Sequence, residues 1–175
     1  MSGVDAGGIK IRLATAADDG AIGELLVRGF VLQYARILPD VVVTDRRKAE
    51  LRDVARKRAV AKVWVAEMAG EIVGTVALWA PGAEGSEAWI GTACDLRHLV
   101  VNDVARGRGV SNMLLAATEE EAWRIGATHI CLHVRHEAQG VARVYQRRGY
   151  VRILEGDIDQ RPDVLLDAYV LARPA

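Results

Sequence analysis

The 175-residue sequence is poor in cysteine and in surplus charge, and each shortage excludes a class of protein. Two cysteines are too few for a disulfide scaffold, so we expect Cys94 and Cys131 to be buried free thiols. Lys plus Arg and Asp plus Glu number 23 each, so the formal net charge is zero. This balance argues against general binding to nucleic acid or to an anionic membrane, and leaves room only for a local charged patch.

The sequence also lacks long apolar runs, internal repeats and linker-like segments. No apolar run approaches the ~18 residues of a membrane span. The first residues, MSGVDAGGIKIRL, contain no cationic segment followed by an apolar core, so we expect no signal peptide and a cytoplasmic protein. Length and a hydrophobic share of 51% favour one domain over residues 9–175, after a disordered N-terminal tail at 1–8.

Hydrophobic periodicity predicts the order β, α, α, β, β, β, α, β, α, β, β. Alternation predicts a strand over 9–15, a hairpin over 62–80 that turns at Ala69-Gly70, and a long strand over 89–101. Thr15 and Asp18 resemble a capping box before the first helix, and Thr44 caps a single second helix over 45–60. Later strands are expected over 128–135, 150–155 and 164–173. The pattern indicates a mixed sheet with helices on its faces, in the α/β or α+β class.

The segment ARGRGVS, residues 105–111, places two glycines and two arginines between an apolar strand and a helix. Glycines allow positive φ angles and let a ligand approach the backbone, and the first amides of a helix have no intrahelical partners. Such a turn can cradle a pyrophosphate, with Arg106 and Arg108 adding charge-assisted hydrogen bonds. A solvated surface turn explains the same letters, so the segment alone leaves both interpretations open.

Two signatures together make the chain resemble the GNAT superfamily of acetyl-CoA-dependent N-acetyltransferases. The phosphate turn of that family reads Arg/Gln, any, any, Gly, any, Gly/Ala, which residues 106–111 match with Ser111 in the last small position. The family's second signature is matched by Ala142, Tyr145, Gly149 and Tyr150. The resemblance covers about residues 60–155. The sequence departs from the family at Gln139, where asparagine is frequent, and at Asn102-Asp103, where a proline often begins the turn.

The resemblance implies a mostly antiparallel central sheet of about seven strands flanked by about four helices, and acetyl-CoA as cofactor. Backbone groups at the end of the strand before the turn would bind the pantetheine arm, and amides of residues 107–111 would bind the pyrophosphate. The implied cofactor-binding residues are Leu99, Val101, Arg106, Gly107, Arg108, Gly109, Val110, Ser111, Gln139 and Ala142.

The chemistry of acetyl transfer needs a base for the amine and an acid for the departing thiolate. Tyr145 stands at the position that commonly supplies the acid in the family, although a packed ring explains it too. The candidates for the base are Asp95, otherwise a salt-bridged residue, and His98, otherwise a core histidine. In an unbroken strand these two point to opposite faces, which a bulge could change. The resemblance also places His133 and His136 near the thioester end of the cofactor. We expect ordinary structural roles for both.

A metal site is not expected. His129, Cys131 and His133 alternate onto one strand face, but the sequence contains neither C-x-x-C nor H-E-x-x-H, and the family chemistry needs no metal.

The acceptor is expected to be a small-molecule or peptide amine, and four candidate residues line its site: Tyr34, Arg36, Trp79 and Trp89. Relatives in the family are often dimers, so the resemblance also implies a homodimer, for which VLLDAYVLA suits an interface strand. Two other interpretations stay open. The same fold can hold acyl-CoA without turnover as a sensor module, or the turn can belong to an unrelated α/β domain without affinity for CoA.

Overall fold

The computed structural model describes residues 3–4 and 8–175. Contacts between Cα atoms divide the chain into two compact units: residues up to Leu78 with His98–Glu120, and Trp79–Arg97 with Glu121–Ala175. Of the tail predicted over 1–8, the structure describes strand β1, Gly3–Val4, and Gly8, and the remainder lies outside the described residues.

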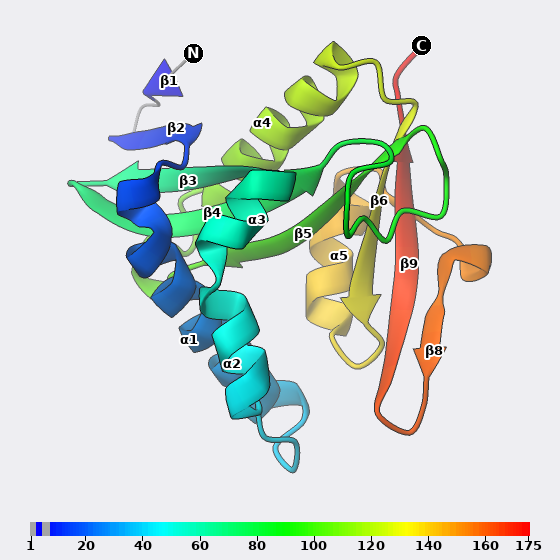
Figure 1. Ribbon diagram of the computed structural model, residues 1–175, viewed down its shortest axis with the longest axis horizontal. Helices are drawn as coiled ribbons and strands as arrows, with labels where there is room; N and C mark the ends of the chain where they lie inside the picture. Colours follow the sequence, from blue (N-terminus) through cyan, green and yellow to red (C-terminus); the bar gives the residue numbers. More distant parts are fainter. Residues whose placement is uncertain (1–2, 5–7) are drawn as a thin grey trace. The chain divides into compact units, whose positions relative to one another are not determined.

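The sheet of the first unit is antiparallel. It contains β1, β2 (Ile9–Leu13), β3 (Lys62–Met68) and β4 (Glu71–Trp79), whose last residue belongs to the second unit (Figure 1). The β3–β4 hairpin turns at Ala69 and Gly70, with φ of 52° and 83°. The predicted hairpin is therefore confirmed, since both turn residues adopt the left-handed conformation that a tight turn requires.

The first unit also carries helices α1 (Asp19–Ile37), α2 (Asp45–Arg52) and α3 (Val54–Val60). The predicted capping box is present at Thr15 and Asp18, and the side chain of Thr44 caps α2 by accepting from the amide of Arg47. The prediction of a single helix over 45–60 is wrong. Asp53 lies outside the helical region at φ −76° and ψ 63°, and its side chain accepts from the amide of Arg56, so it starts a new helix.

Two glycines allow helices to approach strands closely in the first unit. A Cβ on Gly29 of α1 would lie 2.5 Å from a methyl carbon of Val100 on β5 (Ala93–Val101). A Cβ on Gly74 of β4 would lie 3.0 Å from side-chain atoms of both Val110 and Leu114 on α4 (Val110–Arg124). These contacts fix the strand that precedes the Gly–Arg turn and the helix that follows it.

The second unit contains the start of β5, together with β6 (His129–Arg135), α5 (Gln139–Arg147), β7 (Val151–Arg152), β8 (Ile158–Gln160) and β9 (Val164–Ala172). The start of β5 pairs in parallel with β6, from Ala93 opposite His129 to Leu96 opposite Leu132. Strands β6, β7 and β8 each pair antiparallel with β9 (Figure 1). The strand predicted over 150–155 is shorter, because residues 154–156 form a 3-10 turn.

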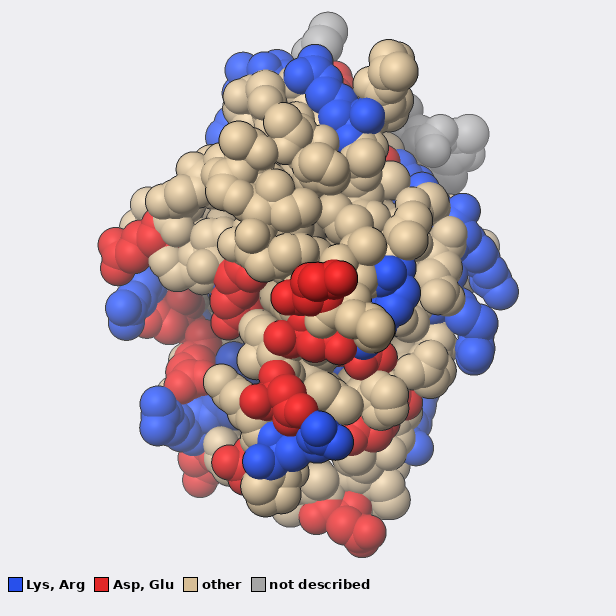
Figure 2. Space-filling view, turned by 90° about the vertical axis from the view of Figure 1, so that its right-hand side faces the viewer, with Lys and Arg blue, Asp and Glu red and all other residues tan. Residues whose placement is uncertain are grey.

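The predicted fold class is confirmed: strands β1–β9 and helices α1–α5 make a mixed α/β protein with mostly antiparallel pairing. Cys94 and Cys131 are free and buried, as expected. Within residues 3–4 and 8–175, no helix has the length and apolar character needed to cross a membrane. Figure 2 views the side of β8 and β9 and shows acidic and basic side chains close together.

Candidate active site

The Gly–Arg turn leads from β5 into α4 within the first unit. Gly107 and Gly109 have φ of 74° and 76°, in the left-handed region that favours glycine. A Cβ on either residue would meet no heavy atom within 4 Å, so the space beside the backbone is open. Helix α4 begins at Val110, and the amides of its first turn lack intrahelical partners. The turn therefore combines an accessible backbone with the positive end of a helix dipole.

The side chains around the turn add positive charge. Arg106 and Arg108 are exposed, and Arg106 forms an ion pair of 2.7 Å with Asp103. Asp103 also lies 4.0 Å from Arg36 of α1. Arg36, predicted to contact the acceptor amine, therefore lies beside the turn. Asn102, where the family often has proline, caps a short 3-10 turn by accepting from the amide of Val104. A pyrophosphate fits this set of open amides and guanidinium groups.

His98 interrupts the regular geometry of β5. Its φ is 60°, a left-handed value that is rare for a residue with a side chain. The His98 ring packs edge-on against Phe30, at 6.1 Å between centroids, and Phe30 lies 6.5 Å from Tyr34. The expectation that Asp95 and His98 point to opposite faces assumed an unbroken strand, and it does not apply here. Leu99 and Val101, the predicted pantetheine contacts, are half-buried and follow this irregularity.

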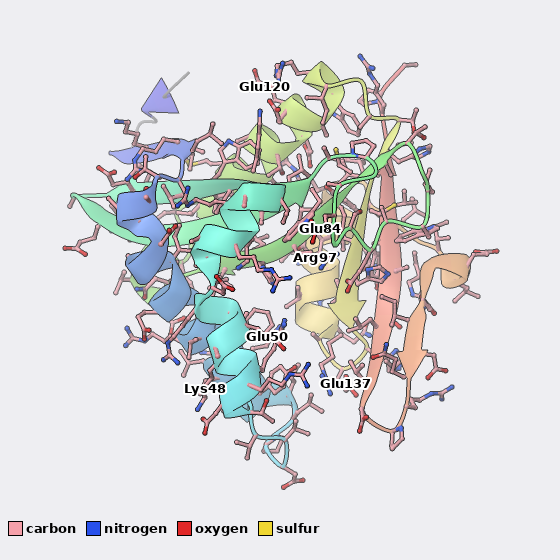
Figure 3. The ribbon with its side chains drawn as sticks, in the orientation of Figure 1. Lys48, Glu50, Glu84, Arg97, Glu120 and Glu137 are labelled. Atoms are coloured by element: carbon pink, nitrogen blue, oxygen red, sulfur yellow. The ribbon has the colours of Figure 1, made fainter. Side chains whose placement is uncertain are left out.

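Asp95 is fully buried in the second unit, and its carboxylate anchors the loop that follows β4. It accepts from the backbone amide of Glu87 at 2.7 Å and from Nε of Arg97 at 2.8 Å. The Arg97 guanidinium also donates to the carbonyl of Gly85 at 2.6 Å and lies 4.6 Å from the ring centroid of Trp79. Figure 3 labels Arg97 together with Glu84 of this loop. These contacts favour structural roles for Asp95 and for Trp79 over those of base and acceptor contact.

Helix α5 holds the predicted acid. Tyr145 is 6% exposed, and its ring meets Tyr150 at 5.5 Å in an edge-to-face arrangement. Burial raises the pKa of Tyr145 well above its ordinary value, so the phenol keeps its proton at neutral pH. Ala142 is buried on the same helix, and Gln139 donates from its side-chain amide to the carbonyl of His136 at 2.6 Å.

Trp89, predicted to contact the acceptor, packs within the second unit. Its ring lies 5.3 Å from the ring of His133, whose Nε2 is 2.8 Å from the carbonyl oxygen of Gly156. Trp89 is half-buried, and its role as an acceptor contact stays a prediction.

Sequence reasoning missed a histidine–aspartate pair in the second unit. Nδ1 of His136, the residue after β6, lies 3.0 and 3.1 Å from the two carboxylate oxygens of Asp167 on β9. His136 also lines an open pocket with Arg135, Glu137, Arg161, Pro162, Asp163, Val164 and Leu165. The one available signal was Asp167 itself, an acidic residue inside the apolar run VLLDAYVLA.

Comparison with known proteins decides the family. A model of the acetyltransferase (GNAT) domain matches residues 59–152, just over half of the 175 residues. The chain belongs to the GNAT family. The family match spans the turn, Tyr145 and His136, and thus both signatures on which the resemblance was based.

Solved structures support the same fold for this GNAT protein over nearly its whole length. A GNAT-family acetyltransferase from Staphylococcus aureus Mu50 has a TM-score of 0.73 at 15% identity, covering 94% of this chain and 98% of its own. YncA from Salmonella typhimurium, solved with its cofactor acetyl-CoA, has 0.67 at 20%, covering 94% of each chain. A ribosomal-protein-alanine N-acetyltransferase from Brucella melitensis has 0.64 at 19%, covering 93% and 99%. At these identities the similarity establishes the fold.

Proposed function

We propose that this GNAT protein moves an acetyl group from acetyl-CoA to a primary amine. The observation that carries the proposal is the turn at Gly107 and Gly109, with its left-handed glycines, open backbone and adjoining helix start. A phosphate-bearing ligand is the partner that suits such a turn. The acetyl-CoA in the similar structure of YncA supports the same cofactor.

In the first unit, we assign the pyrophosphate to the amides of residues 107–111 and the side chains of Arg106 and Arg108, and the pantetheine arm to backbone groups of Leu99 and Val101. In the second unit, Ala142 of α5 is the residue that the family resemblance assigns to the thioester end. We assign Gln139 a smaller part, because its side-chain amide already donates to the carbonyl of His136.

The proposed reaction is direct attack of the neutral amine on the thioester carbonyl, through a tetrahedral intermediate. Acetyl-CoA supplies the activated acetyl group. Tyr145 donates a proton to the departing thiolate, since burial raises its pKa and the phenol is protonated at neutral pH. Of the bases considered from the sequence, Asp95 is buried and its Oδ2 accepts from Arg97 and from the amide of Glu87, while His98 stays a prediction.

The acceptor is proposed to be a small-molecule or peptide amine, and the assignment of Tyr34 and Arg36 to its site from the sequence stays a prediction. The Brucella melitensis relative is described as acting on a ribosomal-protein alanine, which supports an amine acceptor of this general class. A cytoplasmic location and a homodimer stay predictions.

The test is binding of acetyl-CoA to the Gly109→Asp variant, measured by isothermal titration calorimetry. The new carboxylate would stand in the open space beside the turn and repel phosphate, so we expect loss of detectable binding. Gly82→Asp is the matched control, because Gly82 also has a left-handed φ, of 72°, and open space around its Cβ position but lies outside the turn. It should bind acetyl-CoA like the wild type. Equal affinity in all three proteins would contradict the assignment of the turn.

A further inference from the structure

The pair formed by His136 and Asp167 follows from the register of two strands. Strand β6 pairs with β9 so that Val134 lies opposite Asp167, and the amide of His136 continues the ladder by donating to the carbonyl of Leu165 at 3.0 Å. Side chains two residues apart share a face of a sheet, so His136 and Asp167 are diagonal neighbours. This brings together residues 31 apart in the sequence.

The hydrogen bonds of Asp167 orient its carboxylate and the ring of His136. Its carboxylate is 7% exposed and accepts from the guanidinium of Arg152 at 3.2 Å as well as from His136. Because a carboxylate oxygen accepts, we assign Nδ1 of His136 as the donor of this pair. The neutral ring then has its lone pair on Nε2, for which no hydrogen-bond partner exists among residues 3–4 and 8–175.

Further contacts hold Asp167 in place. Arg152, which orients its carboxylate, forms an ion pair of 2.6 Å with Asp157. Asp157 in turn accepts from the amide of Ala168 on β9 at 2.9 Å. A base oriented by a buried carboxylate, which is itself held by further contacts, is the arrangement that enzymes use to activate a nucleophile.

The ring of His136 is accessible, unlike its partner. The side chain is 57% exposed and lines the open pocket of the second unit, whose volume is about 610 Å³. That volume lies within the range of small-molecule sites, roughly 300–1,000 Å³. The charged residues of the pocket wall are Arg135, Glu137, Arg161 and Asp163, so both signs are present. Figure 3 labels Glu137, the residue after His136, near the arrowhead end of β6.

We propose that His136 is the general base of this enzyme, that Asp167 positions it, and that the pocket beside it receives the acceptor amine. The proposal rests on the proposed function, because it names the base for that same acetyl transfer. It replaces Asp95 and His98, whose surroundings are the loop after β4 and the ring of Phe30.

The proton balance of the step is complete. An acceptor R–NH3+ gives one proton to Nε2 of His136, and the freed lone pair forms the C–N bond with the acetyl carbon. The C–S bond then breaks, its electron pair leaves with sulfur, and Tyr145 protonates the thiolate. The second proton of the amine nitrogen restores Tyr145, and His136 returns its proton to solvent. The products are the amide, the CoA thiol and one released proton.

The experiment measures thiol release from acetyl-CoA by the wild type and by His136→Gln, with a fixed panel of primary amines and with water as the slow acceptor. Removal of a general base should lower kcat by about 10²- to 10⁴-fold, while calorimetry shows unchanged affinity for acetyl-CoA. His129→Gln is the matched control, because His129 lies at the opposite end of β6 and contacts Thr128. It should turn over like the wild type.

A second variant tests the positioning role. Asp167→Asn should lower kcat and shift the ring proton of His136 away from Nδ1, which the ¹⁵N NMR shifts of the ring nitrogens report directly. Unfolding midpoints near that of wild type for the histidine variants separate catalysis from folding.

The outcomes separate the two proposals. If the wild type turns over and His136→Gln has the same kcat with every nucleophile, His136 is not the general base. That result would not contradict the proposed acetyl transfer. A wild type that binds acetyl-CoA and releases no thiol with any nucleophile, water included, contradicts the transfer itself and the base with it. A fall in kcat confined to His136→Gln and Asp167→Asn supports the proposal.

Discussion

At the scale of single residues, Lys57 is the clearest source of instability. Its side chain on α3 is 7% exposed, and Nζ has no hydrogen-bond partner among the described residues. Burial, with a smaller effect of Arg47, lowers the pKa of Lys57 to about 8 from an ordinary 10.5. The unfolded chain therefore binds more protons between these two values, and the free energy of unfolding rises with pH across that window.

Lys57→Met should stabilise the protein near pH 7, because it removes a buried cation and keeps an apolar stem of similar length. The pKa shift corresponds to a gain on the order of 3 kcal/mol. Urea unfolding at several pH values checks this, with Lys48→Met on α2, whose side chain is half-buried and lies 3.8 Å from Asp45, as the control. The advantage should shrink as pH rises from about 8 to 10.5, above which Lys57 is neutral in both states. An advantage that is constant with pH would show that the charge is not the cause.

At the scale of elements, Gly156 in the 3-10 turn after β7 packs closely against Trp89 and β9. A Cβ there would lie 2.5 Å from two ring carbons of Trp89 and 2.7 Å from the Cβ of Ala168. The carbonyl of Gly156 also lies 2.8 Å from Nε2 of His133. The turn, the loop before β5 and strand β9 therefore meet at a point with room only for glycine.

Gly156→Ala should destabilise the protein by about 1–3 kcal/mol, because the added methyl group must displace a packed indole ring or a strand. Gly140→Ala is the matched control: it lies in α5, where a Cβ would meet only the end of the Arg143 side chain at 3.9 Å. That change should stabilise by about 0.5–1 kcal/mol, since alanine is the better helix former. The midpoint of urea unfolding checks both. A Gly156→Ala protein as stable as the wild type would mean that the indole ring moves freely.

Elements with a local pattern could be predicted from the sequence, and elements that depend on distant partners could not. Alternation identified β2, β6 and the β3–β4 hairpin, since each pattern lies within a few residues. Strand β8 was missed because three residues carry no period, and their pairing with β9 defines them as a strand. The helix break at Asp53 was missed because charged residues on both sides continue a helical composition.

The same distinction holds for the candidate site. The Gly–Arg turn is a local motif, and the structure gives both of its glycines the positive φ expected of them. The partners of Asp95 and the pairing of His136 with Asp167 depend on a loop conformation and on the β6–β9 register, which periodicity does not report. The contacts of Trp79 with Arg97 and of Trp89 with Gly156 likewise form only in the folded chain.

At the scale of the whole molecule, a net charge of zero argues against strong long-range attraction of an anionic ligand, and the face in Figure 2 carries side chains of both signs. Affinity for acetyl-CoA must then come from local contacts at the turn, and a ligand that binds only the folded chain stabilises all of it by mass action. The increase in the free energy of unfolding that a ligand causes therefore reports its binding at the turn.

Acetyl-CoA at ~100 times its Kd should add about 2.7 kcal/mol to the free energy of unfolding. For a chain of 175 residues this raises the unfolding midpoint by about 5–10 °C. CoA should act similarly, because it carries the same pyrophosphate and arm, and ADP should act less, because it lacks the arm. Thermal scans of the wild type and of Gly109→Asp with each ligand check this, and the variant should show no shift. A wild type that none of the three ligands stabilises would leave ARGRGVS as a charged surface turn, since its glycines would then serve only the entry into α4.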